Sequence, residues 1–188
     1  MGQTTPVYCY TDFPTAELFV NGKSQGRISK RKDSKYDRYR LRWNDVKYEP
    51  GELKVVVYDE KGNRAGEQVV RTAGKPVAMK LEADKTVLKA DGNDLAYVTV
   101  SLVDKDGTEI PNATDQLAFE VKGAGSFRAV CNGDATSLEV FTAPTMNLFS
   151  GKLVVTMQAA KHAGDLELVV KDTSNSKLTP SRISLKVE

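Results

Sequence analysis

Alternation of hydrophobic and polar residues with a period of two runs through almost the whole chain. Such stretches are AELFV (16–20), YRLRW (39–43), LAYVTVSLV (95–103), LAFEV (117–121), SFRAV (126–130), LEVF (138–141), KLVVTMQA (152–159), DLELVVKD (165–172) and SRISLKV (181–187). This period places successive side chains on opposite faces of a strand. A helical repeat over ten or more residues is absent, so the sequence predicts an all-β protein.

Turn residues separate these predicted strands. Asn21-Gly22 stands between two apolar runs, which is a strong signal for a tight hairpin. Lys61-Gly62-Asn63 is predicted to close a second hairpin, and Asp106-Gly107 marks a turn after a long strand.

A domain boundary is predicted where Thr72-Ala73-Gly74-Lys75-Pro76 interrupts the strands, because Pro76 cannot continue a ladder of hydrogen bonds. Each side holds about six to nine short strands with the turn spacing of a sandwich. We therefore expect two tandem immunoglobulin-like β-sandwich domains, residues 1–74 and 75–188, which do not repeat each other in sequence.

Composition fits a soluble globular chain: 188 residues, of which 40% are hydrophobic and 28% charged, with a formal net charge of +2. That charge does not predict nucleic-acid binding, although basic residues crowd between Lys23 and Arg42 with Tyr36 and Tyr39 among them. A solvated edge hairpin whose lysines discourage aggregation is the favoured interpretation. An apolar run long enough to span a bilayer is absent, so no membrane insertion is expected.

Candidate chemistry is sparse. Cys9 and Cys131 lie far apart in sequence, a disulfide between them is not expected, and the single His162 is predicted to be an exposed turn residue. Acidic residues fall mostly in turns, where Asp caps backbone donors, so no catalytic carboxylate is expected. The turns at 90–94 and 104–107 resemble pieces of calcium loops but lack the full pattern, leaving a bridging surface cation as the alternative. We expect no metal site and no cofactor.

Trp43 and Tyr48 are the candidate carbohydrate-binding residues. An exposed Trp43 with Tyr48 nearby would stack on a sugar ring, because the C–H face of a sugar meets the π face of an aromatic ring. Alternation of Trp43 with Leu41 and Tyr39 instead favours packing in the core, where a buried tryptophan is common in sandwiches.

The segment VCNGDATSLEVF (130–141) combines Cys, Asp, Thr and Ser in one loop. A thiolate nucleophile would need a nearby cation, a metal would need further ligands, and an anion site would need a following helix. Without these, we predict that Asn132-Gly133-Asp134 forms a turn and that Cys131 points into the core.

The order of these motifs resembles the C-terminal part of glycoside hydrolase family 2, the β-galactosidase family. ELFVNGKSQG (17–26) and VKYEPGELKVVVYD (46–59) resemble the sandwich that follows the catalytic barrel. The stretch from Leu81 to Ala113 and the NGDATS loop resemble the immunoglobulin-like domain at the end of the same enzymes.

The resemblance implies a non-catalytic pair of domains, since the family's two catalytic glutamates lie on a barrel that this sequence lacks. The implied partners are the barrel and the N-terminal domains of a longer parent chain, with oligosaccharide or polysaccharide as a further candidate. We expect the segment Ala143–Phe149 to be a long loop that reaches toward a neighbour. The family implies a periplasmic or extracellular location, although MGQTTP is not a signal peptide and the chain is expected to be a fragment. The alternatives are a carbohydrate-binding module and an adhesin-type surface tandem.

Overall fold

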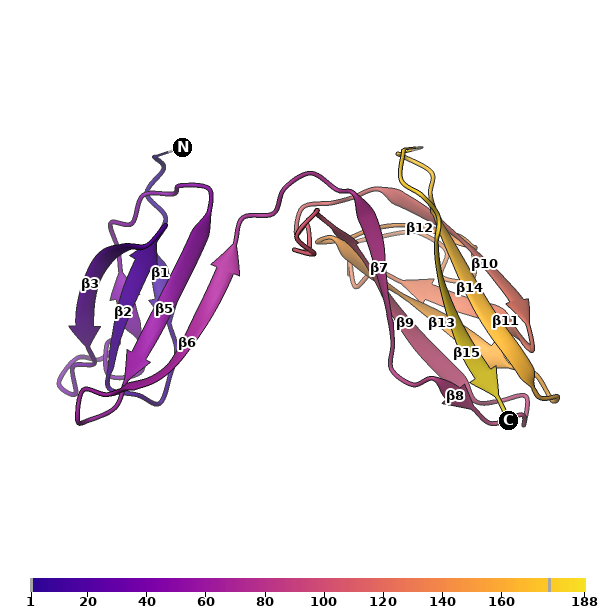
Figure 1. The fold of residues 1–188 in the computed structure, drawn as a ribbon, viewed down its shortest axis with the longest axis horizontal. Helices are drawn as coiled ribbons and strands as arrows, with labels where there is room; N and C mark the ends of the chain where they lie inside the picture. The colour runs from indigo at the N-terminus through magenta and orange to yellow at the C-terminus, as the bar shows by residue number, and fades with distance from the viewer. Residues whose placement is uncertain (1, 176) are drawn as a thin grey trace. The chain divides into compact units, whose positions relative to one another are not determined.

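The computed structural model describes residues 2–175 and 177–188, and within them every regular element is a β-strand. The chain divides into two compact units, Met1–Thr72 and Ala73–Glu188. Each unit packs two sheets against each other, so the predicted all-β class and the pair of tandem sandwiches are confirmed (Figure 1).

The first unit contains a four-stranded antiparallel sheet and a two-stranded one. The larger sheet has the order β3 (Lys23–Ser29), β2 (Thr15–Val20), β5 (Glu52–Tyr58), β6 (Arg64–Arg71), and the smaller sheet pairs β1 (Val7–Cys9) with β4 (Leu41–Trp43). In β2, alternate side chains are buried, as its pattern predicted. The buried core of this unit consists of Ala16, Leu18, Val20, Leu41, Trp43 and Val46.

The two predicted hairpins of the first unit are confirmed. Asn21 and Gly22 have φ values of 49° and 78°, which fit the two central residues of the tight turn between β2 and β3. Between β5 and β6, the Asp59 carboxylate accepts hydrogen bonds from the backbone N–H groups of Lys61 and Asn63, at 2.9 and 2.8 Å.

The second unit is a sandwich of five and four strands. The five-stranded sheet has the order β12 (Thr145–Asn147), β10 (Gln116–Gly123), β14 (Gly164–Asp172), β15 (Ser181–Val187), β8 (Val87–Leu88). The four-stranded sheet has the order β11 (Gly125–Cys131), β13 (Lys152–Ala159), β9 (Leu95–Val103), β7 (Ala78–Ala83). Its ladders are antiparallel except that β15 and β8 run parallel. Fully buried side chains such as Val98, Leu117, Leu153 and Leu166 lie in its core.

Three local predictions were wrong. The predicted strand LEVF forms no strand, and Leu138 is 98% exposed. The predicted loop 143–149 instead contains β12, which pairs with β10 and buries Met146 completely, because Met146 and Leu148 supply the apolar face that the segment 138–141 does not. Tyr39 lies in a turn and is exposed, so only Leu41 and Trp43 of that alternating stretch reach the core.

Candidate functional site

Trp43 occupies the core of the first unit. Its side chain is 6% exposed, and its indole Nε1 donates a hydrogen bond to the backbone carbonyl oxygen of Gly26 at 2.9 Å. An indole in this position presents no open face on which a sugar could stack. Its burial therefore argues against Trp43 as a carbohydrate-binding residue and agrees with the core interpretation.

Tyr48 lies after β4 and keeps an accessible ring, with 43% of its surface exposed. Its backbone N–H donates to the carbonyl oxygen of Gln3 at 2.9 Å, which fixes the segment but leaves the ring outward. Since Trp43 is buried, the two residues do not form a joint stacking platform. A sugar contact by Tyr48 stays a prediction.

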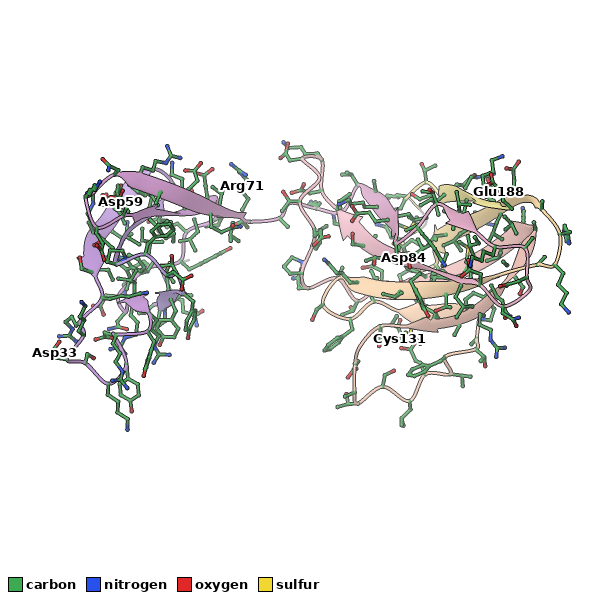
Figure 2. The ribbon with its side chains drawn as sticks, turned by 90° about the horizontal axis from the view of Figure 1, so that it is seen from below. Asp33, Asp59, Arg71, Asp84, Cys131 and Glu188 are labelled. Carbon is green, nitrogen blue, oxygen red and sulfur yellow. The ribbon has the colours of Figure 1, made fainter. Side chains whose placement is uncertain are left out.

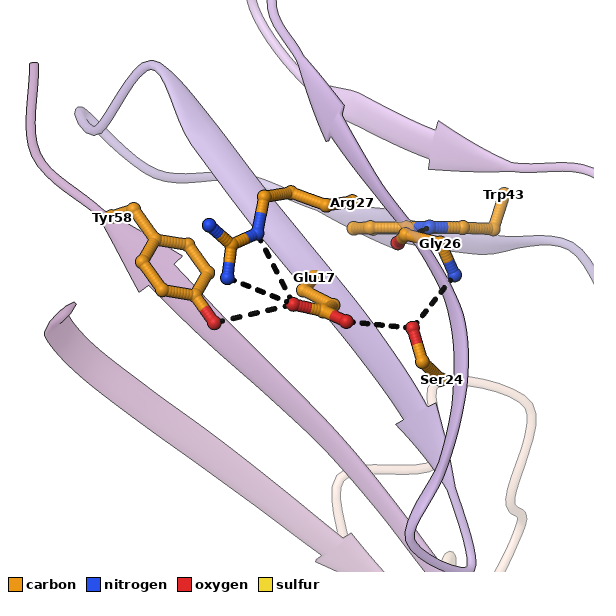
Figure 3. A network of polar contacts seen from close by, with 6 residues as sticks. All are labelled: Glu17, Ser24, Gly26, Arg27, Trp43 and Tyr58. Carbon is orange, nitrogen blue, oxygen red and sulfur yellow. Dashed lines mark hydrogen bonds and ion pairs between the residues drawn. The ribbon is translucent and has the colours of Figure 1, made fainter. Parts of the chain in front are cut away.

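Glu17 on β2 is the centre of a polar network in the first unit (Figure 3). Its carboxylate accepts hydrogen bonds from Ser24 Oγ at 2.7 Å, from Arg27 Nη2 at 3.1 Å and from Tyr58 Oη at 3.3 Å. The Arg27 guanidinium also lies 3.7 Å from the centre of the Tyr58 ring. The hydrogen bond from Ser24, then those from Arg27 and Tyr58, lower the pKa of Glu17, so it is an ionised structural carboxylate rather than a proton donor.

The other carboxyl groups whose pKa is shifted are shifted in the same direction. Hydrogen bonds that they accept, mostly within turns, lower the pKa of Asp37, Asp59, Asp91, Asp94, Asp104 and Asp134. A glycosidase acid needs the opposite shift, so that it holds a proton near neutral pH. These carboxylates therefore cap turns or form ion pairs.

Among the residues that the structure describes, no group of three or more His, Cys, Asp and Glu side chains lies close enough to hold a metal ion. His162 is an exposed residue between β13 and β14. Residues 2–175 and 177–188 contain no helix that is long and apolar enough to cross a membrane.

The polar loop after β11 is held together by its own side chains. Asn132 donates to the carbonyl oxygen of Asn147 at 3.0 Å, and the Glu139 carboxylate accepts from the backbone N–H of Asn147 at 2.9 Å. Asp134 accepts from the backbone N–H of Thr136 at 2.8 Å. Cys131, labelled in Figure 2, is exposed, so the prediction that it points into the core was wrong. Val130, one residue earlier on the alternating strand, takes the buried position. Cys9 is a free thiol in the other unit.

Exposed tyrosines, the exposed Arg38 and the half-buried Arg40 lie on the first unit, in a group that we call the tyrosine–arginine surface: Tyr8, Tyr10, Tyr36, Arg38, Tyr39 and Arg40. The guanidinium carbon of Arg40 lies 5.1 Å from the ring centre of Tyr8 and 5.8 Å from that of Tyr36. Arg38 stacks on Tyr39 at 4.5 Å. Cations over aromatic faces hold both groups in place while leaving ring area exposed.

A polar pocket of about 400 Å³ adjoins this surface, and we call it the Asp37 pocket. It is lined by Ile28, Ser29, Arg31, Asp37, Arg40, Leu41, Arg42 and Asn44. The Asp37 carboxylate pairs with Arg42 Nε at 2.6 Å and also with Arg31. The hydrogen bonds from Arg42 and then Arg31 lower the pKa of Asp37 to about 2. Figure 2 shows the neighbouring loop at Asp33 extending away from the strands.

The sequence does not predict this pocket as a site; its one local signal is the basic stretch Lys23–Arg42 with Tyr36 and Tyr39. The stretch does contain an edge strand, β3, followed by a loop. Its Arg40 contacts Tyr8 and Tyr10, which come from the segment around β1 about thirty residues earlier. A contact between two such distant segments has no local sequence signal.

Comparison with known proteins connects the chain to glycosidases. Residues 79–182 match the family described as glycoside hydrolase family 2 C-terminal domain 5, and residues 2–66 match a domain of unknown function, DUF4982. The β-galactosidase BoGH2A of Bacteroides ovatus is 40% identical over 168 residues, which is 89% of this chain and 19% of that protein. The chain thus spans about a fifth of the length of this curated relative.

Solved structures agree with this connection. A glycosyl hydrolase family 2 member from Bacteroides cellulosilyticus superposes with a TM-score of 0.92 at 30% identity, over 100% of this chain and 23% of that one. A β-glycosidase from Bacteroides vulgatus gives 0.87 at 28% identity, over 99% and 23%. Because the family match covers more than half of the residues, the chain belongs to the C-terminal domains of glycoside hydrolase family 2.

Proposed function

We propose that the two sandwiches are non-catalytic accessory domains of a β-galactosidase-type glycoside hydrolase, and that they support its catalytic barrel and the rim of its substrate site. The observation that carries this proposal is the extent of the match with BoGH2A: 89% of this chain corresponds to only 19% of that enzyme. A segment of this size and all-β composition has no room for a (β/α)₈ barrel, which needs about 250 residues.

The electrostatics of the carboxyl groups support the same conclusion. Retaining and inverting glycosidases both require a carboxylic acid that stays protonated until it donates to the leaving group. Glu17 and Asp37 are instead ionised and neutralised by arginine partners. We infer that these carboxylates stabilise the fold and do not act on a glycosidic bond.

Exposed apolar residues on the second unit support a contact with other parts of a larger enzyme. Leu138, Val140 and Phe141 project from the segment after β11, and Phe149 is also exposed nearby in the sequence. Large apolar side chains gathered on one loop are typical of surfaces that a partner covers. We propose that the covering partner is another domain of the same parent chain.

The purified chain tests the non-catalytic part of this proposal. Assays with 4-nitrophenyl β-galactoside, β-mannoside and β-glucuronide should give no hydrolysis above the buffer. Turnover that a single carboxylate substitution abolishes would contradict the proposal. Reading the residues encoded ahead of Met1 is an independent check: a catalytic barrel is expected there, and further immunoglobulin-like repeats would favour a surface tandem instead. A periplasmic or extracellular location stays a prediction, which fractionation of the native organism tests.

A further inference from the structure

The charges that line the Asp37 pocket do not balance. Three guanidinium groups, those of Arg31, Arg40 and Arg42, face one carboxylate, that of Asp37, which leaves an excess of two positive charges. Asp37 uses its two oxygens on Arg31 and Arg42. The exposed Asp33 on the same loop adds negative charge near Arg31. Arg40 is therefore the pocket cation that an incoming anion would find without a carboxylate partner.

Arg40 is held in place but is not saturated with hydrogen bonds. Its Nη1 donates to Tyr10 Oη at 3.2 Å, and its guanidinium lies over the rings of Tyr8 and Tyr36. Its Nε is buried and lacks an acceptor among the described residues. That nitrogen is closed to solvent, so a ligand acceptor would meet the Nη groups of Arg40, of which Nη1 makes one hydrogen bond, to Tyr10. A planar guanidinium fixed in this way suits a carboxylate, which it binds through two parallel hydrogen bonds.

The aromatic rings beside Arg40 favour a sugar over a free anion. Tyr8 and Tyr36 are about half exposed, so each offers a face to the C–H groups of a pyranose ring. The pocket volume of about 400 Å³ also falls in the range of small-ligand sites and exceeds what a bare carboxylate would fill. Nucleic acid is less well matched, because the chain carries a net charge of only +2.

We propose that the Asp37 pocket and the adjoining tyrosines bind a uronic-acid residue of an acidic saccharide, whose carboxylate pairs with Arg40 while its ring packs on Tyr36 or Tyr8. The inference rests on the proposed function, since a saccharide is the expected ligand only on a domain of a carbohydrate-degrading enzyme. In that enzyme, the site would hold a uronic-acid residue of an acidic polymer.

The test is an NMR titration of the ¹⁵N-labelled chain, in which the arginine Nε–Hε signals report on Arg40 directly. Methyl β-D-galacturonide is compared with methyl β-D-galactoside, which differs only in carrying a CH₂OH group in place of the carboxylate. Sodium acetate at the same ionic strength represents the free anion, and a short oligouridylate represents nucleic acid. We expect a saturable shift of the Arg40 signal with the galacturonide, at a Kd at least tenfold below those of the other three ligands.

Two variants locate the interaction. Arg40→Gln should weaken galacturonide binding at least tenfold, whereas Arg38→Gln, whose guanidinium lies on Tyr39 and does not line the pocket, should change it less than twofold. Should Arg40→Gln fail to fold, Tyr36→Leu at an exposed position provides the alternative and should weaken binding several-fold.

The proposal is overturned by an absence of saturable binding, by equal binding of galactoside, by equal binding of acetate, by tighter binding of the oligonucleotide, or by an unchanged Kd in both pocket variants. None of these results touches the proposed accessory function, because that function is judged by the hydrolysis assay and by the domains encoded upstream. A chain that hydrolyses glycosides but still binds galacturonide at Arg40 would contradict the accessory function alone.

Discussion

The indole Nε1 of Trp43 lies 2.9 Å from the carbonyl oxygen of Gly26 and donates a hydrogen bond to it. Trp43 belongs to β4 in the two-stranded sheet, whereas Gly26 belongs to β3 at the edge of the four-stranded sheet. This hydrogen bond therefore links the two sheets of the first unit at β3, the strand that begins the basic stretch Lys23–Arg42.

Burial of Trp43 can be measured without any substitution. Trp43 is the only tryptophan of the chain, so the indole fluorescence reports on this residue alone. We expect a blue-shifted emission maximum and weak acrylamide quenching in the native state, with a red shift and strong quenching in 6 M guanidinium chloride. If acrylamide quenches the native chain as strongly as the unfolded chain, the indole is exposed. Trp43 would then again be a candidate for stacking on a sugar.

Replacement of Trp43 separates its packing from its hydrogen bond. Trp43→Ala should reduce the free energy of unfolding of the first unit by about 3–5 kcal/mol, because it leaves a cavity in a small core. Trp43→Phe keeps most of the packing and should cost about half as much or less, part of it from the lost hydrogen bond to Gly26. Urea denaturation followed by circular dichroism measures both. Tyr48→Ala is the matched control at an exposed aromatic position and should stay within about 0.5 kcal/mol of the wild type.

The ion pairs of Asp37 predict a specific dependence of stability on pH. The pKa of Asp37 is about 2 in the folded chain, below its ordinary value of 3.8, so folding favours the ionised form. Its contribution is complete above pH 3.8 and is lost as the pH falls toward 2. The urea midpoint should therefore decrease over this window in the wild type and decrease less in Asp37→Asn.

The exposed Asp45, just after Trp43, supplies the control for that experiment. Asp45→Asn should keep the wild-type slope between pH 4 and 2. A slope that is the same in wild type and Asp37→Asn would mean that the pairs with Arg42 and Arg31 do not contribute to folding.

Gly51 is predicted to be intolerant of any side chain. Its φ is +136°, and a Cβ there would lie 1.9 Å from Oδ1 of Asn21, the atom that accepts the backbone N–H of Glu52. Gly51→Ala should cost about 2–4 kcal/mol through strain and the displaced hydrogen bond. Gly107→Ala has a positive φ but open space around it, so it should cost only about 1 kcal/mol. Equal losses in urea denaturation would mean that the contact with Asn21 is unimportant.

The parts of the fold that could be predicted from sequence are those with local causes. The strands β2 and β9 and the Asn21-Gly22 turn depend only on neighbouring residues. They could therefore be predicted from the alternation and the turn residues. The segment 138–141 has the same alternation and still forms no strand; there, the Glu139 carboxylate accepts hydrogen bonds from the backbone N–H and the side-chain amide of Asn147. The alternation of polar and apolar residues does not show whether a polar side chain faces solvent or forms a hydrogen bond with a distant backbone group.

The Asp37 pocket and the tyrosine–arginine surface depend even more on contacts between residues that are far apart in the sequence. Arg40 could be counted as one basic residue among several, but its position over Tyr8 and Tyr36 and its unpaired Nε follow from the packing of β1 against the loop before β4. Trp43 could be weighed as core or as platform from its alternation with Leu41, and only its burial in the folded unit decides between them.

Thermal inactivation of the parent enzyme, with and without these 188 residues, tests the proposal that the two domains support a catalytic barrel. Activity on a small soluble glycoside is measured after heating, so that substrate capture by the domains does not enter. We expect that removing them lowers the inactivation temperature by several degrees or leaves the barrel insoluble. A truncated enzyme with the same inactivation temperature and the same kcat/KM as the full-length enzyme would contradict it.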